Sequence, residues 1–68
     1  MLINVFIERK NENAILELKE DSSIHDLLNL LNVNPITIIP VKNGEVVTED
    51  IKLEDNDNIK LMSVVSGG

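Results

Sequence analysis

Residues 2–8 alternate between two sets of side chains. One set is β-branched and consists of Ile3, Val5 and Ile7, and the other consists of Asn4, Phe6 and Glu8. A period of two predicts a β-strand with two different faces. A polar turn at residues 9–13 follows, and Ala14, Leu16 and Leu18 then occupy every second position of residues 14–19. We therefore predict a β-hairpin at the start of the chain.

The period changes to that of a helix after this hairpin. Four apolar residues are spaced i, i+3, i+4 and i+7, namely Ile24, Leu27, Leu28 and Leu31. This spacing places them in one stripe of an amphipathic helix. Ser23 and Asp26 have the form of a capping box, which starts the helix. We expect the helix to run to about Asn32, before Pro35.

Three further strands are predicted in the second half of the chain, at residues 36–42, 45–48 and 58–65. The first two are joined by Asn43-Gly44, which favours a two-residue hairpin because both positions tolerate a positive φ. Pro40 has no N–H to donate to a sheet, so we expect it to face solvent or a bulge. An acidic loop separates the second of these strands from the last.

The predicted order of elements is therefore ββαβββ. One helix is enough to cover one face of a mixed four- to five-stranded sheet, and a right-handed crossover lets the first and last strands pair in parallel at its centre. This is the α+β architecture of the β-grasp, or ubiquitin-like, fold. We expect one domain at residues 1–65 and a flexible tail at residues 66–68.

Length and composition exclude several classes of function. A chain of 68 residues forms one small domain, without room for the pocket of roughly 300 Å³ or more that a catalytic site normally needs. We therefore expect a carrier or binding module and no catalytic residues, not a free-standing enzyme. The absence of cysteine excludes disulfides, thiolate zinc sites and cysteine nucleophiles.

Charge and hydropathy restrict the partners and the location. The formal net charge is −6, from 12 acidic and 6 basic residues. Nucleic-acid binding needs clustered Lys and Arg, so we expect no nucleic-acid partner, whereas a protein with a basic surface would suit this charge. No apolar run approaches the roughly 18 residues of a membrane span, and residues 1–4 lack the basic region of a signal peptide. We expect a cytoplasmic protein that does not bind membranes.

The motif that points to chemistry is Ser66-Gly67-Gly68, directly after the last predicted strand. Glycine has no side chain and tolerates any φ, so such a tail can enter a narrow active site of another protein. A carboxylate becomes a good electrophile only when joined to a leaving group, usually by adenylation with ATP. The chain has no Gly-rich phosphate loop, so we expect a separate activating enzyme to act on the carboxylate of Gly68. The alternative is a frayed end without a role.

Three segments together resemble the MoaD/ThiS family of ubiquitin-like sulfur carrier proteins. They are Ser-Ile-His-Asp-Leu-Leu at residues 23–28, Val-Lys-Asn-Gly-Glu-Val-Val at residues 41–47, and the stretch from residue 55 to the Gly-Gly end. The resemblance covers nearly the whole chain. The short length looks more like the ThiS branch than the MoaD branch, and the chain is also similar to small archaeal modifier proteins. The family commonly has Asp-Gly-Asp where this chain has Asp55-Asn56-Asp57, a mild departure because Asn also tolerates the left-handed conformation.

The resemblance implies a sulfur carrier that binds no cofactor or metal itself. An activating enzyme would use ATP to adenylate Gly68, with Gly67 as the flexible approach, and a sulfur donor would convert the adenylate to a thiocarboxylate. A sulfur-accepting synthase would then receive the sulfur, for thiamin thiazole, molybdopterin or tRNA thiolation. The free carrier is expected to be a monomer.

Partner enzymes in this family grip the tail and the exposed sheet face near it. Phe6 and Met62 are the residues that we expect on this face, and an exposed Phe6 would be an anchor for a partner. The alternative is that Phe6 is partly covered by a neighbouring strand.

Two other functions fit the same sequence. One is a ubiquitin-like protein modifier conjugated to target lysines through Gly68, and the other is a β-grasp interaction module with an idle tail. Of the remaining candidates, we interpret His25 as a surface helix residue and Ser22 and Ser23 as capping residues. Asp55 and Asp57 indicate a turn more than a cation site. No single lysine stands out as a conjugation site.

Overall fold

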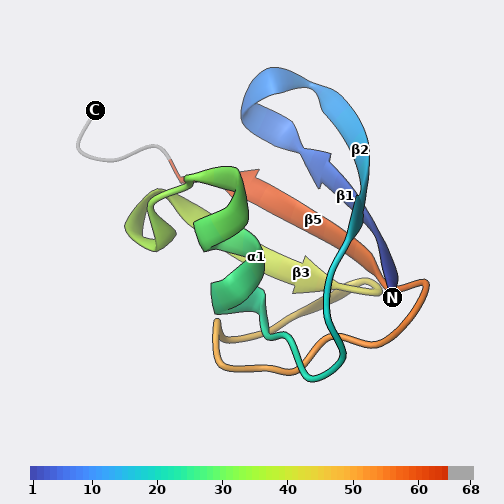
Figure 1. Ribbon diagram of the computed structural model, residues 1–68. Coiled ribbons are helices and arrows are strands. Elements are labelled where there is room, and N and C mark those ends of the chain that lie inside the picture. The colour runs from blue at the N-terminus through green and yellow to red at the C-terminus, as the bar shows by residue number, and fades with distance from the viewer. Residues whose placement is uncertain (65–68) are drawn as a thin grey trace.

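The computed structural model describes residues 1–64, with five strands, one α-helix and two short 3-10 turns in this range (Figure 1). The elements follow one another as β1 (Leu2–Ile7), η1 (Glu8–Lys10), β2 (Glu12–Glu17), α1 (Ile24–Leu31), η2 (Pro35–Thr37), β3 (Ile38–Lys42), β4 (Glu45–Val46) and β5 (Asn58–Ser63). The predicted ββαβββ order is confirmed. Within residues 1–64, no helix is long and apolar enough to cross a membrane.

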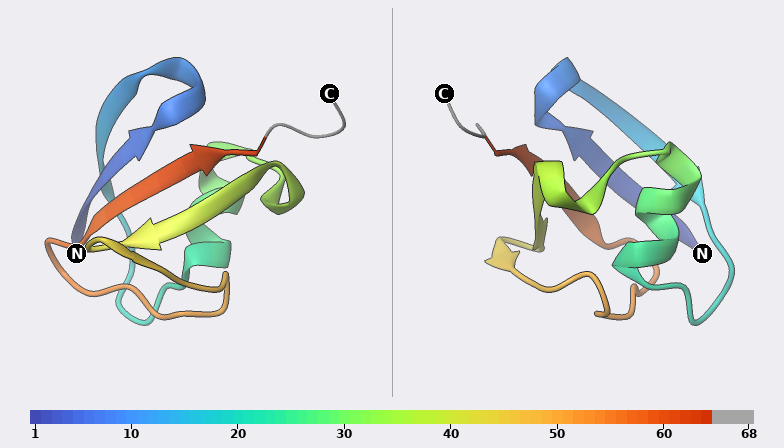
Figure 2. Two further views of the ribbon diagram at one scale, coloured as in Figure 1. Left: turned by 180° about the vertical axis from the view of Figure 1, so that it is seen from behind. Right: turned by 90° about the vertical axis from the view of Figure 1, so that its left-hand side faces the viewer.

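The strands form one mixed sheet in the order β2-β1-β5-β3-β4. β1 and β5 pair in parallel at its centre, as predicted, and the other neighbouring strands pair antiparallel. α1 lies across one face of the sheet (Figure 1), which we call the inner face. The left view of Figure 2 looks onto the opposite face, which no other element of residues 1–64 covers. We call this the outer face.

The core lies between α1 and the inner face. Nine apolar residues are buried there: Ile3, Val5, Ile24, Leu27, Leu28, Ile38, Leu53, Ile59 and Leu61. The strand register brings Val5 opposite Ile59 and Ile7 opposite Leu61. The inward-facing side chains of these two parallel strands therefore pack against the apolar side chains of α1. The predicted inward-facing residues of the first and last strands are confirmed, and Ile7 is partly buried.

The first turn of α1 has a partner for each of its four free N–H groups, which an α-helix leaves unsatisfied at its start. The capping box is present: Ser23 Oγ accepts from Asp26 N at 3.3 Å, and Asp26 Oδ2 accepts from Ser23 N at 2.9 Å. The loop before β5 supplies the remaining acceptors. Its Ile51 carbonyl accepts from Ile24 N at 2.9 Å, and its Glu49 carbonyl accepts from His25 N at 2.8 Å.

The helix ends where the sequence predicts, although Pro35 is not the direct cause. Asn32 takes the left-handed conformation at φ 58°, and its N–H donates to the Leu28 and Asn29 carbonyls. An Asn in this position closes a helix with little strain. The last helical residue, Leu31, therefore lies four residues before the proline.

The predicted strand boundaries in the second half are wrong by a few residues. Residues 35–37 form η2 and not strand, because Asn34 Oδ1 accepts from Ile36 N at 3.0 Å and holds a turn. β4 is only two residues long, and β5 ends at Ser63. Pro40 O accepts from Val47 N at 3.0 Å, so the C=O and the nitrogen of Pro40 lie on the side of β3 that faces away from β5. On that side, β4 has already ended at Val46. The missing N–H of Pro40 therefore costs no bond between β3 and β5.

Candidate functional site: the outer face and the root of the tail

Two hydrogen bonds hold the end of β5, one from each side. Ser63 N donates to Glu8 Oε1 at 3.0 Å, and Val64 N donates to Thr37 O at 3.0 Å. We call Ser63 and Val64 the tail root, because the predicted tail follows them in the chain. The predicted site residues Ser66, Gly67 and Gly68 lie outside the described residues, as does Val65.

Apolar side chains from all five strands gather on the outer face. The alternation of buried and exposed positions and the strand register assign seven of them to it: Leu2, Phe6, Ile15, Ile39, Val41, Val46 and Met62. Ile15 and Val46 are 69% and 71% exposed. Contiguous exposed apolar surface on a small protein commonly marks a binding site. The outer face is therefore the strongest candidate for a docking surface within residues 1–64.

Phe6 and Met62 both lie on the outer face, as their positions in the alternation predict, and both are half-buried. Phe6 is opposite Lys60 on β5, and Lys60 Nζ lies 6.0 Å from the centre of the Phe6 ring. The sequence left two possibilities for Phe6, an exposed ring or a ring partly covered by a neighbouring strand. The half-buried position of Phe6 fits the second possibility better. The role of Phe6 and Met62 in partner binding stays a prediction.

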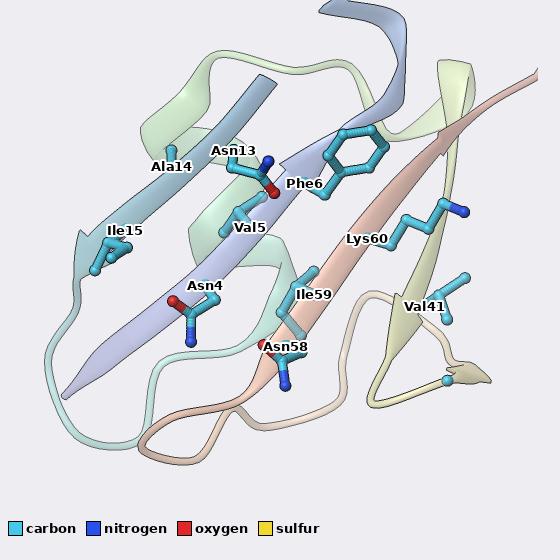
Figure 3. Close-up of a pocket in the computed structure, with 11 residues that line it drawn as sticks. Asn4, Val5, Phe6, Asn13, Ala14, Ile15, Val41, Asn58, Ile59 and Lys60 are labelled. Carbon is cyan, nitrogen blue, oxygen red and sulfur yellow. The ribbon is translucent and has the colours of Figure 1, made fainter. Parts of the chain in front are cut away.

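An open hollow occupies the middle of the outer face (Figure 3). Phe6 and Lys60 stand side by side at one part of it, and Ile15 and Val41 stand on strands to either side. Asn4 and Asn58, which face each other across β1 and β5, add polar groups. A surface of this kind combines an apolar centre with amide groups and one cation, which suits a protein partner.

Five apolar residues of the outer face were not predicted from the sequence as members of a binding surface: Leu2, Ile15, Ile39, Val41 and Val46. The signal for Ile15 was available, because it alternates with Ala14 and Leu16, which the hairpin pattern assigns to the inner face. Ile39 and Val41 could be assigned only once the strand start was known, because residues 36–42 contain apolar side chains on both faces. The register pairs Ile39 with Met62 and Val41 with Lys60, which places Ile39 and Val41 on the outer face.

The acidic loop before β5 is organised around one buried carboxylate. Asp57 is 5% exposed, and it accepts from Asn43 Nδ2 at 3.0 Å and from Glu54 N at 2.7 Å. Lys42 Nζ lies 3.5 Å from Asp57 Oδ2 and 3.3 Å from Glu54 Oε1. Burial alone raises the pKa of Asp57, but the two hydrogen bonds and the Lys42 charge outweigh burial, so that the pKa lies below its usual value.

The Lys42 side chain is largely buried, with 15% of it exposed. Burial alone lowers its pKa, but the hydrogen bond to Glu54 and the charges of Asp57 and Glu54 outweigh burial and raise it. The contacts among Lys42, Glu54 and Asp57 therefore join the β3–β4 hairpin to the loop before β5. They are structural ion pairs, far along β5 from the tail root.

The other candidates have structural partners. His25 is exposed on α1, and its Nδ1 lies 3.2 Å from Glu49 Oε1, which fits the interpretation as a surface residue. Asp55 Oδ1 accepts from Leu2 N at 2.8 Å, so Asp55, like Asp57, shapes the turn before β5. Within residues 1–64, no group of three or more His, Asp or Glu residues is arranged to hold a metal ion.

Comparison with known proteins agrees with this arrangement. The sequence profile of the ThiS family matches residues 1–68. The chain belongs to the ThiS family. Carrier proteins of this family are substrates of activating enzymes and not enzymes themselves, in agreement with the expectation drawn from the length of the chain.

Among curated proteins, this ThiS-family chain is similar to the sulfur carrier protein TtuB of Thermus thermophilus. The two are 28% identical over 60 residues, which is 88% of this chain and 92% of TtuB. Among solved structures, SAMP1 from Haloferax volcanii matches with a TM-score of 0.78 at 17% identity, over the full length of both chains. A chain from the complex of subunits 1 and 2 of molybdopterin-converting factor from Helicobacter pylori matches with a TM-score of 0.74 at 21% identity, again over both full lengths.

A designed protein based on ubiquitin also matches, with a TM-score of 0.76 at 20% identity over 98% of this chain and 92% of the other. At these identities the solved structures establish the fold. The β-grasp prediction is thereby confirmed.

Proposed function

We propose that this protein is a sulfur carrier whose working group is the carboxylate of Gly68. The observation that carries the proposal is the match of the ThiS family along the whole chain to residue 68, supported by the similarity to the sulfur carrier TtuB. The carrier would act in the cytoplasm, within a pathway of cofactor biosynthesis or tRNA thiolation.

The proposed chemistry has two steps. A carboxylate oxygen of Gly68 attacks the α-phosphorus of ATP on the activating enzyme, and pyrophosphate leaves to give the acyl adenylate. Hydrosulfide then attacks the carbonyl carbon, and AMP leaves. With hydrosulfide, the products are the thiocarboxylate, AMP and a proton. Gly67 and Gly68 have no side chains that would obstruct entry into the enzyme.

We propose that the outer face is the docking surface for the activating enzyme. The tail root lies at the end of β5, and the same strand contributes Lys60 and Met62 to the outer face. A partner that contacts this face is therefore next to the point where the tail leaves the sheet. Phe6 is the aromatic side chain there, and aromatic residues are frequent anchors at the centre of protein interfaces.

The test is activation of the purified chain in an extract of its native cells, supplied with ATP and sulfide. Intact mass of the chain reports exchange of one carboxylate oxygen for sulfur. We expect this exchange in the full chain and its loss when Gly67 and Gly68 are deleted. A tail-deleted chain that still supports growth as well as the full chain would favour the interaction module, and lysine conjugates of Gly68 would favour the modifier.

Docking is tested separately by Phe6→Ser, with Leu30→Ser as the control. Leu30 is an apolar residue of α1 that is 56% exposed and does not belong to the outer face. We expect Phe6→Ser to raise the apparent KM of activation at least about tenfold, the factor typical of an interface anchor, and Leu30→Ser to leave it unchanged. Equal effects of the two substitutions would contradict docking through the outer face.

A further inference from the structure

The end of β5 extends past the strand that pairs with it. β1 pairs with β5 only as far as Ile7 opposite Leu61, because the chain then turns into η1. Beyond Leu61, the Ser63 N–H points to this side of β5 without a strand to accept it. An unpaired main-chain donor at a strand end frays easily.

The Glu8 side chain takes the place of the missing strand. Its Oε1 accepts from Ser63 N at 3.0 Å, across a separation of 55 residues in the sequence. The acceptor is a carboxylate, and hydrogen bonds to ionised acceptors are stronger than those between neutral groups.

The turn η1 fixes the main chain of Glu8. Asn11, in the left-handed conformation at φ 51°, closes the turn, and its N–H donates to Glu8 O at 3.0 Å. Glu8 is thus held directly after the end of β1, within reach of β5. On the other side of β5, Thr37 O accepts from Val64 N. The tail root is therefore bound from both sides.

We propose that Glu8 is a positioning residue that holds the tail root through its carboxylate and so sets where the tail leaves the sheet. The consequence for activation rests on the proposed function. A partner that docks on the outer face then finds the tail starting from a fixed point. Without Glu8, the last residues of β5 would also have to be ordered when the tail enters the active site, and ordering each residue has an entropic cost.

The effect should appear in kcat and not in KM. Glu8 does not belong to the apolar set on the outer face, so docking stays intact when it is substituted, whereas productive entry of the tail becomes less frequent. This distinguishes Glu8 from Phe6, for which we expect a change in KM.

The experiment compares Glu8→Ala and Glu8→Gln with Glu12→Ala in the full chain. Glu12 is an exposed acid at the start of β2, opposite Ile7, so its substitution removes the same charge near the same end of the sheet. Amide hydrogen exchange of Ser63 by NMR is the local readout. The denaturant midpoint reports global stability, and activation in the native extract gives apparent kcat and KM.

In Glu8→Ala we expect exchange of the Ser63 amide to accelerate roughly tenfold, the factor expected for loss of one hydrogen bond to a charged group, with kcat lowered several-fold and KM unchanged. Glu8→Gln keeps an oxygen acceptor and should restore most of both values, and Glu12→Ala should match the wild type. Unchanged exchange at Ser63 in Glu8→Ala would overturn the inference, as would faster exchange with an unchanged kcat. Failure of the wild-type chain to be activated would instead overturn the proposed function, and it leaves the exchange result readable on its own.

Discussion

At the scale of single residues, polar groups are buried at the two ends of β5, the Asp57 carboxylate and the Ser63 hydroxyl, and their surroundings differ. Asp57, just before the strand, has hydrogen bonds from Asn43 and Glu54 and the charge of Lys42 close by. Ser63, at its other end, has a buried Oγ that has no hydrogen-bond partner within residues 1–64. The first arrangement stabilises the folded chain, whereas in the second no group of residues 1–64 offsets the desolvation of the hydroxyl.

We expect Asp57→Asn to lower the free energy of unfolding by about 1–3 kcal/mol at neutral pH, because Lys42 and two donors lose a buried anionic acceptor. The pKa of Asp57 is lower in the folded chain than the usual value, which is about 3.9 in the unfolded chain. Its contribution is therefore complete above that value and disappears as the pH falls through the lower folded pKa.

Urea unfolding of wild type and Asp57→Asn between neutral and strongly acidic pH checks this prediction. The difference between their free energies of unfolding should shrink as the pH falls below about 4. Glu17→Gln, at an exposed position of β2, is the control and should leave stability at neutral pH unchanged. A difference between wild type and Asp57→Asn that stays constant across this range would contradict the role given to the Asp57 charge.

For Ser63 we expect the opposite sign. Ser63→Ala removes the buried hydroxyl and keeps the N–H that donates to Glu8, so the free energy of unfolding should stay the same or rise by up to about 1 kcal/mol. Equilibrium unfolding in urea measures it. A loss of stability of similar size would show that the hydroxyl has a partner in the last four residues of the chain.

At the scale of elements, α1 depends on local and distant residues together. The capping box is formed by Ser23 and Asp26 from the same turn, whereas the Glu49 and Ile51 carbonyls come from a loop more than 20 residues further on. The position of the helix start is therefore set by local residues, and hydrogen bonds to the helix start hold the loop before β5 in place.

Ser23→Ala should lower the free energy of unfolding by about 1 kcal/mol, the usual cost of a lost N-cap. Ser22→Ala is the matched control, because the Ser22 main chain takes part in two hydrogen bonds and its side chain in none within residues 1–64. Thermal or urea unfolding of both variants gives the comparison. An equal loss in the two would mean that the capping box contributes little beyond general packing.

The order of the elements, the two hairpins, the parallel pairing of β1 with β5, and the faces of β1, α1 and β5 could be predicted because these segments have a clear period and distinct turn residues. The ends of the elements could not. η2 replaces the expected start of β3 because Asn34 caps a turn, and β5 ends where Thr37 and Glu8 bind its last residues. The Glu8 contact spans 55 residues of sequence, and in the alternating pattern Glu8 is simply an outward polar residue. No pattern among neighbouring residues in the sequence indicates a contact over such a separation.

At the scale of the whole molecule, the acidic loop and the tail root lie at opposite ends of β5. Half of the 12 acids fall between Glu45 and Asp57, in the hairpin and loop before the strand, and the tail root is at its other end (Figure 1). The six residues of β5 separate the two by about 20 Å. The acidic loop is therefore suited to long-range attraction of a basic partner, whereas the outer face and the tail root are where we propose direct contact.

The proposed function depends on Gly68 carrying sulfur. The most direct measurement is the intact mass of the chain purified from its native cells, with fragmentation at the C-terminus. We expect a fraction of molecules in which one oxygen of the Gly68 carboxylate is replaced by sulfur. A carboxylate that remains unmodified in cells, and also after incubation with ATP, a sulfur donor and native extract, would contradict it.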